Sequence, residues 1–328
     1  MLGDVVRSKP FTVHITRAGI SRVSMLPVGF RCAAALCLLC GIVAVAFADA
    51  PVSTLKRIKD TRSIVIGHRE SSIPFSYLDD QGRPIGYSVD ICMKIVESIK
   101  RRLDMPDLTV RYRAVSSKDR IALVKDGSVD LECGSTTNTL EREREVAFSV
   151  TVFVTANRLV AKKSTGVRIL THLKNKTVVS TAGTTSLKQL KDFNETYHYG
   201  MTVLEGRDHA ESFAMVEDGR AAAFSMDDIL LASLVANSAN PGDYALTVQA
   251  LSVEPYGIML RRGDPVFKRT VDDAIIALYR SGEIAQIYAK WFEAPIPPKK
   301  ITLKTPMSEA LRNVIQRPTD SGNPAVYH

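Results

Sequence analysis

SVDLECGSTTN, residues 128–138, begins with Val129 and Leu131 at alternate positions and ends in glycine, hydroxyl and amide side chains. SIVIGHRESS, residues 63–72, begins as a short apolar run and also ends in polar residues, so both are predicted to be buried strands that end in polar loops. Apolar residues at helical spacing predict a helix over 88–103 with Ser88 as its N-cap, then a strand over 108–113 and a helix over about 118–127. This β-α-β-α-β order predicts an α/β protein with a mostly parallel sheet.

The alternation of strands and helices starts again after residue 150. The predicted strands cover 153–161, 176–181, 202–205 and 221–225. One predicted helix begins at Gly183, and two others cover 210–218 and 228–239. Two α/β lobes are therefore predicted. Because open α/β sheets bind ligands outside the carboxyl ends of their strands, the gap between two such lobes is the expected ligand site.

Residues 1–50 are predicted to be a signal peptide rather than part of the fold. Residues 1–31 are basic, residues 32–47 are apolar, and two A-x-A sites follow. The apolar run is shorter than the roughly 20 residues of a membrane span, although an uncleaved anchor is the alternative. Met25 offers a second start that gives a compact signal. A cleaved signal places the mature protein in the periplasm.

The composition is that of a soluble globular protein. Of 328 residues, 45% are hydrophobic and 24% charged, which excludes collagen-like, disulfide-dense and largely disordered chains. The formal charge is +8, of which +5 remains once residues 1–50 are removed. Basic and acidic residues alternate, as in EREREV at 141–146, whereas a nucleic-acid binder concentrates basic residues on one face. We expect no nucleic-acid partner.

Cys92 and Cys133 are the two cysteines outside the predicted signal. Two buried free thiols are favoured over a disulfide, since the sequence does not place the two side chains next to each other. No C-x-x-C or H-E-x-x-H pattern occurs, so no metal site is predicted.

Hydroxyls, arginines, one histidine and one aspartate recur where predicted strands end. These candidate ligand-binding residues are Arg69, Ser117, Arg120, Ser135, Thr137, Arg142, Thr185, His209 and Asp227. Arginine matches a carboxylate with a two-pronged donor, helix amides after Gly183 favour an anion, and a carboxylate suits an ammonium. Each feature alone has an ordinary structural explanation, such as an N-cap at Asp227. Their combination at successive strand ends indicates a binding site.

Several motifs resemble those of the periplasmic glutamate/aspartate-binding proteins of amino-acid ABC importers, over about residues 53–320. The motifs are GHRESSIPFSYLDDQGRPIGY (67–87), LECGSTTNTLEREREVAFS (131–149), TAGTTS (181–186), RDHAESF (207–213), AAAFSMDDILLA (221–232), YGIMLRRGDPVFK (256–268) and KWFEAPIPPK (290–299). GHRESS and ECGSTT are typical of binders of acidic amino acids.

The resemblance implies the type II periplasmic-binding fold, in which two α/β domains are joined by two crossover strands with the ligand cleft between them. We place the crossings near Val150–Val154 and Ser252–Pro255. Lobe 1 is then 51–152 with 254–328, and lobe 2 is 153–253. The resemblance also implies a monomer without a cofactor. This monomer would bind L-glutamate or L-aspartate and deliver it to inner-membrane ABC permease subunits.

The resemblance further implies a role for each candidate residue. The ligand's α-carboxylate goes to Arg142, Thr137 and Thr185, and its ammonium goes to Asp227 and Ser135. The side-chain carboxylate goes to residues at four positions: Arg69, Ser117, Arg120 and His209.

Charge counting within the site favours an acidic ligand. Three arginines against Asp227 give +2, or +3 with a protonated His209. A neutral ligand would leave Arg69 and Arg120 without an anionic partner, which costs about 2–5 kcal/mol. An enzyme on the same fold, such as a cyclohexadienyl dehydratase-like protein, is the alternative, but no Ser-His-Asp or Cys-His arrangement is apparent. An amino-acid sensor lobe is a further alternative.

Overall fold

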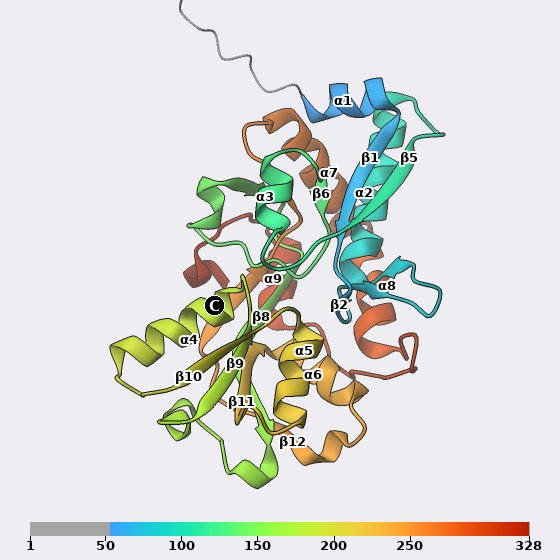
Figure 1. The fold of residues 1–328 in the computed structure, drawn as a ribbon. Helices are drawn as coiled ribbons and strands as arrows, with labels where there is room; N and C mark the ends of the chain where they lie inside the picture. The colour runs from blue at the N-terminus through green and yellow to red at the C-terminus, as the bar shows by residue number, and fades with distance from the viewer. Residues whose placement is uncertain (1–52, 328) are drawn as a thin grey trace, which may run out of the picture. The chain divides into compact units, whose positions relative to one another are not determined.

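The computed structural model describes residues 53–327, and two β-sheets organise most of them (Figure 1). The strands of the first sheet are β1 (Ser63–His68), β5 (Thr109–Ala114), β6 (Leu131–Glu132), β7 (Val146–Phe148) and β14 (Met259–Arg261). They lie in the order β5-β1-β6-β14-β7, with β1 parallel to β5 and β6. The associated helices are α1 (Thr54–Thr61), α2 (Tyr87–Leu103), α3 (Arg120–Lys125), α7 (Pro265–Ser281) and α8 (Glu283–Tyr288).

The second sheet has the order β10-β9-β11-β8-β12, and a further strand, β13, pairs with β8. Its strands are β8 (Phe153–Lys162), β9 (Thr177–Thr181), β10 (Thr202–Gly206), β11 (Ala223–Asp227), β12 (Tyr244–Leu246) and β13 (Ser252–Tyr256). Its helices are α4 (Thr185–Thr196), α5 (His209–Glu217) and α6 (Asp228–Asn237). A small third sheet joins β2 (Ser71–Ser72), β3 (Ser76–Leu78) and β4 (Pro84–Ile85).

The chain passes between the two large sheets twice. It leaves the first sheet after β7 and enters the second at β8, then returns from β13 to β14. The antiparallel pair β8–β13, with Thr155 opposite Glu254, lies next to both predicted crossings. Neither sheet is mostly parallel: two of four strand pairings are parallel in the first sheet and two of five in the second. The reason is that β14 and β8 enter from the other sheet and run antiparallel to their neighbours. The predicted two-lobed α/β architecture is confirmed.

The start of α2 differs from the prediction. The helix begins at Tyr87, and Ser88 lies inside its first turn instead of capping it. The Ser88 hydroxyl donates a hydrogen bond to the carbonyl of Gly134 at 2.7 Å, in a fully buried position. Helix α1 was not predicted, because its sequence is polar and only Thr54, Leu55 and Ile58 are buried.

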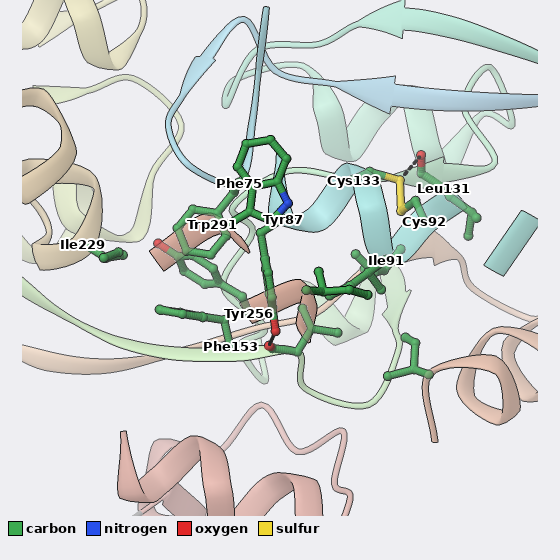
Figure 2. Packing of buried hydrophobic residues seen from close by; sticks show 14 of the residues in the cluster. Phe75, Tyr87, Ile91, Cys92, Leu131, Cys133, Phe153, Ile229, Tyr256 and Trp291 are labelled. Atoms are coloured by element: carbon green, nitrogen blue, oxygen red, sulfur yellow. Dashed lines mark hydrogen bonds between the residues drawn. A yellow bond between two sulfur atoms is a disulfide. The ribbon is translucent and has the colours of Figure 1, made fainter. Parts of the chain in front are cut away.

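Cys92 and Cys133 form a disulfide, so the prediction of two free thiols is wrong. Cys92 lies on the buried face of α2 and Cys133 follows β6, with their Cα atoms 6.3 Å apart (Figure 2). Helical packing against the sheet brings together two side chains that are 41 residues apart in sequence. The bond therefore ties α2 to the loop that carries several candidate site residues.

An aromatic cluster packs against the two crossing strands. Phe153 of β8 and Tyr256 of β13 both contact Phe75 (Figure 2), with ring centroids 4.8 and 5.2 Å away. The ring of Phe292 lies 4.9 Å from that of Phe153. Tyr87 of α2 packs edge-on against Phe75, Phe153 and Phe292. The base of both crossings is thus anchored in the hydrophobic core.

The C-terminal segment after residue 294 packs against both crossing strands. It contains α9 (Glu309–Gln316), which contacts β8 and α7. Beyond α9, the carbonyl of Thr319 accepts a hydrogen bond from the Thr151 amide at 2.8 Å. The hydroxyl of Tyr327 lies 2.7 Å from Thr151 Oγ1, and its ring is buried.

No helix within residues 53–327 combines the length and apolar character needed to cross a membrane. The predicted signal peptide, its cleavage sites and the second start at Met25 lie outside the described residues.

Candidate functional site

Six of the nine candidate residues follow the strands of the first sheet. They are Arg69 after β1, Ser117 and Arg120 after β5, and Ser135, Thr137 and Arg142 after β6. Because β1 pairs in parallel with both β5 and β6, the three loops leave the sheet at one edge. All six side chains are buried. The structure therefore brings together residues that are up to 73 positions apart in sequence.

The other three candidates occupy the corresponding edge of the second sheet. Thr185 is the first residue of α4 after β9, and Thr184 caps that helix by accepting a hydrogen bond from the Leu187 amide. His209 is the first residue of α5 after β10, and Asp227 is the last residue of β11. His209 and Asp227 are buried, while Thr185 is half-buried.

The two edges contact each other. Arg142 donates from Nη1 to the carbonyl of Thr137 at 2.8 Å and from Nη2 to the carbonyl of Gly183, in the second sheet's loop, at 3.3 Å. Gly183 has φ +76°, and a Cβ there would lie 2.6 Å from both Lys118 Cα and the carbonyl oxygen of Ser117. Only glycine allows this approach of one loop to the other.

Among the candidate residues, five buried side-chain atoms at this junction have no hydrogen-bond partner. They are Arg69 Nη1, Ser117 Oγ, Arg120 Nε, Ser135 Oγ and His209 Nε2, out of eight such atoms in residues 53–327. Leaving a buried polar atom unpaired costs about 1–3 kcal/mol, so a cluster of them indicates a place for a polar ligand.

The charged form of each of the three site arginines is destabilised by its surroundings. Burial, followed by repulsion from Arg120, lowers the pKa of Arg69 to about 10 and that of Arg142 to about 10. Burial also lowers the pKa of Arg120, whose Nη1 donates to the carbonyl of Ser135 at 3.3 Å. An anion bound among these groups would relieve both the desolvation and the repulsion.

His209 is neutral in this environment. Burial is the largest cause that lowers its pKa well below the usual value, and the charges of Arg69 and Arg120 lower it further. Its Nδ1 lies 2.9 Å from Thr181 Oγ1, which orients the ring and leaves Nε2 unpartnered.

Asp227 holds its proton more tightly than an ordinary aspartate. Burial, with Glu254 as the next cause, raises the pKa of Asp227 to about 8. The hydroxyl of Tyr256 donates to Oδ2, and that of Ser186 donates to Oδ1 at 3.4 Å. The carboxyl is therefore positioned by two hydroxyls but forms no salt bridge with a residue of 53–327.

Two buried carboxylates in the site were missed by the sequence prediction. Glu132, the last residue of β6, accepts a hydrogen bond from the Thr136 hydroxyl, and Glu254 of β13 accepts from Thr185 Oγ1 at 2.9 Å. Both are buried, and their charges raise the pKa values of the site arginines. The available signal was an acidic residue inside each predicted buried strand.

These carboxylates correct the charge count. Three arginines face three carboxyl groups, so the sum of +2 is wrong, and the neutral His209 excludes +3. A surplus of positive charge remains around Arg69 and Arg120, which lie close enough to repel each other. Glu132 is the acidic group that acts most strongly on both.

The Thr185 hydroxyl has a partner within the protein. It donates to Glu254, whose other oxygen accepts from Gln189 Nε2 at 2.8 Å. Gln189 in turn accepts from Asn157 Nδ2 of β8 at 2.9 Å. A ligand at this position would therefore receive the Thr185 backbone amide at the start of α4 rather than its hydroxyl hydrogen.

Residues 53–327 contain no group of three or more His, Cys, Asp or Glu side chains arranged as metal ligands would be. The polar groups of the site match an organic zwitterion. The arginines and hydroxyls can donate to its anionic groups, and the carboxyl of Asp227 can pair with its cationic group.

Comparison with known proteins gives consistent relatives. Residues 64–294 match the family of bacterial extracellular solute-binding proteins, family 3. The L-glutamate/L-aspartate-binding protein of Pseudomonas aeruginosa is 50% identical over 274 residues, which is 83% of this chain and 91% of the relative. The glutamate/aspartate import solute-binding protein of Salmonella typhimurium is 44% identical over 273 residues, covering 83% and 90%.

Solved structures agree on the fold. The solute receptor for L-cysteine of Neisseria gonorrhoeae is 26% identical and superposes with a TM-score of 0.66, covering 78% of this chain and all of that protein.

Proposed function

The chain belongs to the bacterial extracellular solute-binding proteins of family 3, and from this premise we propose that it binds an acidic amino acid, L-glutamate or L-aspartate. Relatives with 44–50% identity carry these two amino acids in their names. They are binding proteins, so the enzyme alternative is not favoured.

The observation that carries this proposal is the set of five unpartnered buried polar atoms. All five belong to residues that the sequence pattern selected, and they come from both sheets. Three of them can donate to carboxylate oxygens as they stand, namely Arg69 Nη1, Ser117 Oγ and Arg120 Nε, and Ser135 Oγ can accept from an ammonium. A ligand with two carboxylates would satisfy more of these atoms than a neutral amino acid.

We assign three subsites to the ligand. Arg69, Ser117, Arg120 and His209 would bind the side-chain carboxylate. Arg142, Thr137 and Thr185 would bind the α-carboxylate, with Thr185 using its backbone amide. Asp227 and Ser135 would bind the ammonium, which supplies the cationic partner that Asp227 lacks.

The acidic preference follows from the local surplus of positive charge at Arg69 and Arg120. A glutamine amide placed there would leave that surplus unpaired in a buried environment. The loss of a buried charge partner costs about 2–5 kcal/mol, which is about 30-fold or more in affinity.

Ligand capture would proceed by closure of the lobes. The ligand contacts donors from both sheets, so its binding is stronger in the closed form and shifts the population there. The hydrogen bond from Arg142 to Gly183 and the contact of Gly183 with residues 117–118 are contacts of such a closed form.

Delivery to ABC permease subunits in the inner membrane is part of the same proposal, as is export through cleavage of residues 1–50. The protein would act as a monomer in the periplasm. Sequencing the N-terminus of the exported protein tests the cleavage, and uptake by cells lacking the protein tests the delivery.

Calorimetric titration of the purified protein with glutamate, aspartate, glutamine and asparagine tests the ligand assignment. We expect the two acidic amino acids to bind at least about 30-fold more tightly than their amides. Equal affinities for glutamate and glutamine would contradict the assignment.

A further inference from the structure

Glu132 is a buried carboxylate beside the two arginines of the proposed side-chain subsite. It ends β6, and none of its surface is exposed. Its Oε2 accepts a hydrogen bond from the Thr136 hydroxyl, and the same hydroxyl accepts one from Arg120 Nη1. Thr136 therefore links the carboxylate to the guanidinium without placing them in direct contact.

Gly134 leaves the space that Glu132 and Arg69 fill. A Cβ on Gly134 would lie 2.2 Å from Glu132 Oε1 and 2.9 Å from Arg69 Cγ. The carboxylate and the stem of the arginine thus pack against the same backbone position. Oε1 has no hydrogen-bond partner. A carboxylate kept in a buried place with one oxygen unpaired is costly, which favours a role for its charge.

We propose that Glu132 sets the number of negative charges that the side-chain subsite accepts. The inference rests on the proposed function, because it concerns the subsite assigned to the ligand's side chain. Arg69 and Arg120 carry two positive charges and Glu132 offsets one of them. A side chain with one negative charge then completes the balance. A side chain with two negative charges leaves an unpaired anion in a buried environment, so it is rejected.

Two ligands of matched shape separate charge from size. L-Cysteate carries a tetrahedral sulfonate with one negative charge. L-2-amino-3-phosphonopropanoate has the same chain length and a tetrahedral phosphonate, which carries two negative charges above its second pKa. We expect the wild-type protein to bind cysteate at least about tenfold more tightly than the phosphonate at such a pH, as the Coulomb energy of one extra charge implies.

Glu132→Gln removes the charge and keeps the shape of the side chain. We expect the ratio of cysteate to phosphonate affinity to fall by about tenfold or more in this variant, because two guanidinium charges are then available to the phosphonate. Glu145→Gln is the matched control, since Glu145 pairs with Lys125 at the surface and its loss should leave the ratio unchanged. An unchanged ratio in Glu132→Gln would overturn the inference.

The wild-type protein provides a second test that needs no variant. Lowering the pH below the second pKa of the phosphonate gives it one charge, so its affinity should rise to that of cysteate measured at the same pH. A difference that persists at low pH would also overturn the inference. If the wild-type protein binds glutamate and cysteate while Glu132→Gln leaves the ratio unchanged, the Glu132 inference alone fails. If it binds neither, the proposed function itself is wrong.

Discussion

Replacing Asp227 by asparagine tests how the site receives an ammonium group. Burial and then Glu254 raise the pKa of Asp227 to about 8. An acid with that pKa is about nine-tenths protonated at pH 7. A cation in contact lowers the pKa of a carboxyl by about 1–3 units, so binding should release about 0.4–0.9 proton at pH 7. His209 should stay neutral, because burial, the largest cause of its lowered pKa, persists with ligand bound.

Calorimetry in two buffers with different ionisation enthalpies measures this proton release directly. Because the free site holds the proton and the bound site loses it, glutamate affinity should rise as the pH increases from 6 to 7.5. Asp227→Asn should release no proton and bind at least about 30-fold more weakly at pH 7.5, because the ammonium loses its charge partner.

Asp228→Asn is the matched control for this prediction. Asp228 is the next residue, and its carboxylate accepts hydrogen bonds from Thr155 Oγ1 at 2.6 Å and Arg158 Nε at 3.0 Å. Its charge also raises the pKa of Asp227, but less than burial and Glu254 do. This variant should therefore keep most of the proton release of the wild type. Tight glutamate binding by the wild type without any proton release at pH 7 would refute the reasoning about Asp227.

Alanine at Arg142 should weaken every amino acid ligand by about 30-fold or more in calorimetry, whereas alanine at Arg69 should mainly weaken acidic ligands. Alanine at Gly183 places a Cβ 2.6 Å from the facing loop, so affinity should fall by about tenfold or more as closure becomes harder, and small-angle scattering with glutamate should report a larger radius of gyration. Reduction of the Cys92–Cys133 disulfide, which closes 41 residues, should lower the free energy of unfolding by about 4 kcal/mol in urea titrations.

Each of these predictions has its own control. Equal losses for neutral and acidic ligands in both arginine variants would remove the division of roles between them. Alanine at Gly127, which has open space around it and a similar positive φ, controls for backbone strain alone. If that variant binds as weakly as the Gly183 variant, strain rather than contact is responsible. For the disulfide, a double serine variant should match the reduced protein and be insensitive to reductant.

Much of the fold was predictable because its signals are local. Each signal can be recognised within a short stretch of sequence. Examples are the apolar run of β1, the helical spacing in α2 and the glycine before α4. The clustering of candidate residues at each sheet edge was predictable for a related reason. Parallel strands bring their carboxyl ends to one edge, so polar residues that follow strands of one sheet, such as Arg69 after β1 and Ser117 after β5, converge.

The contacts that the sequence did not reveal depend on packing between distant segments. The Cys92–Cys133 disulfide requires α2 to cross β6 at a particular register. Glu132 and Glu254 lie within strands, where a side chain's direction is set by the pleat and by its partners. Counting charges along the chain therefore included the arginines and omitted the carboxylates that offset them.

The position of Tyr327 has a consequence for anyone who attaches a reporter to this protein. Its ring is buried and its hydroxyl contacts Thr151, between β7 and the first crossing strand. A fluorophore or affinity handle inserted directly after Tyr327 would emerge beside the first crossing strand, which is the pivot of the proposed closure, so it would move little and could impede the motion. Labels placed on the outer ends of α2 and α4 would instead move apart and together with each capture event.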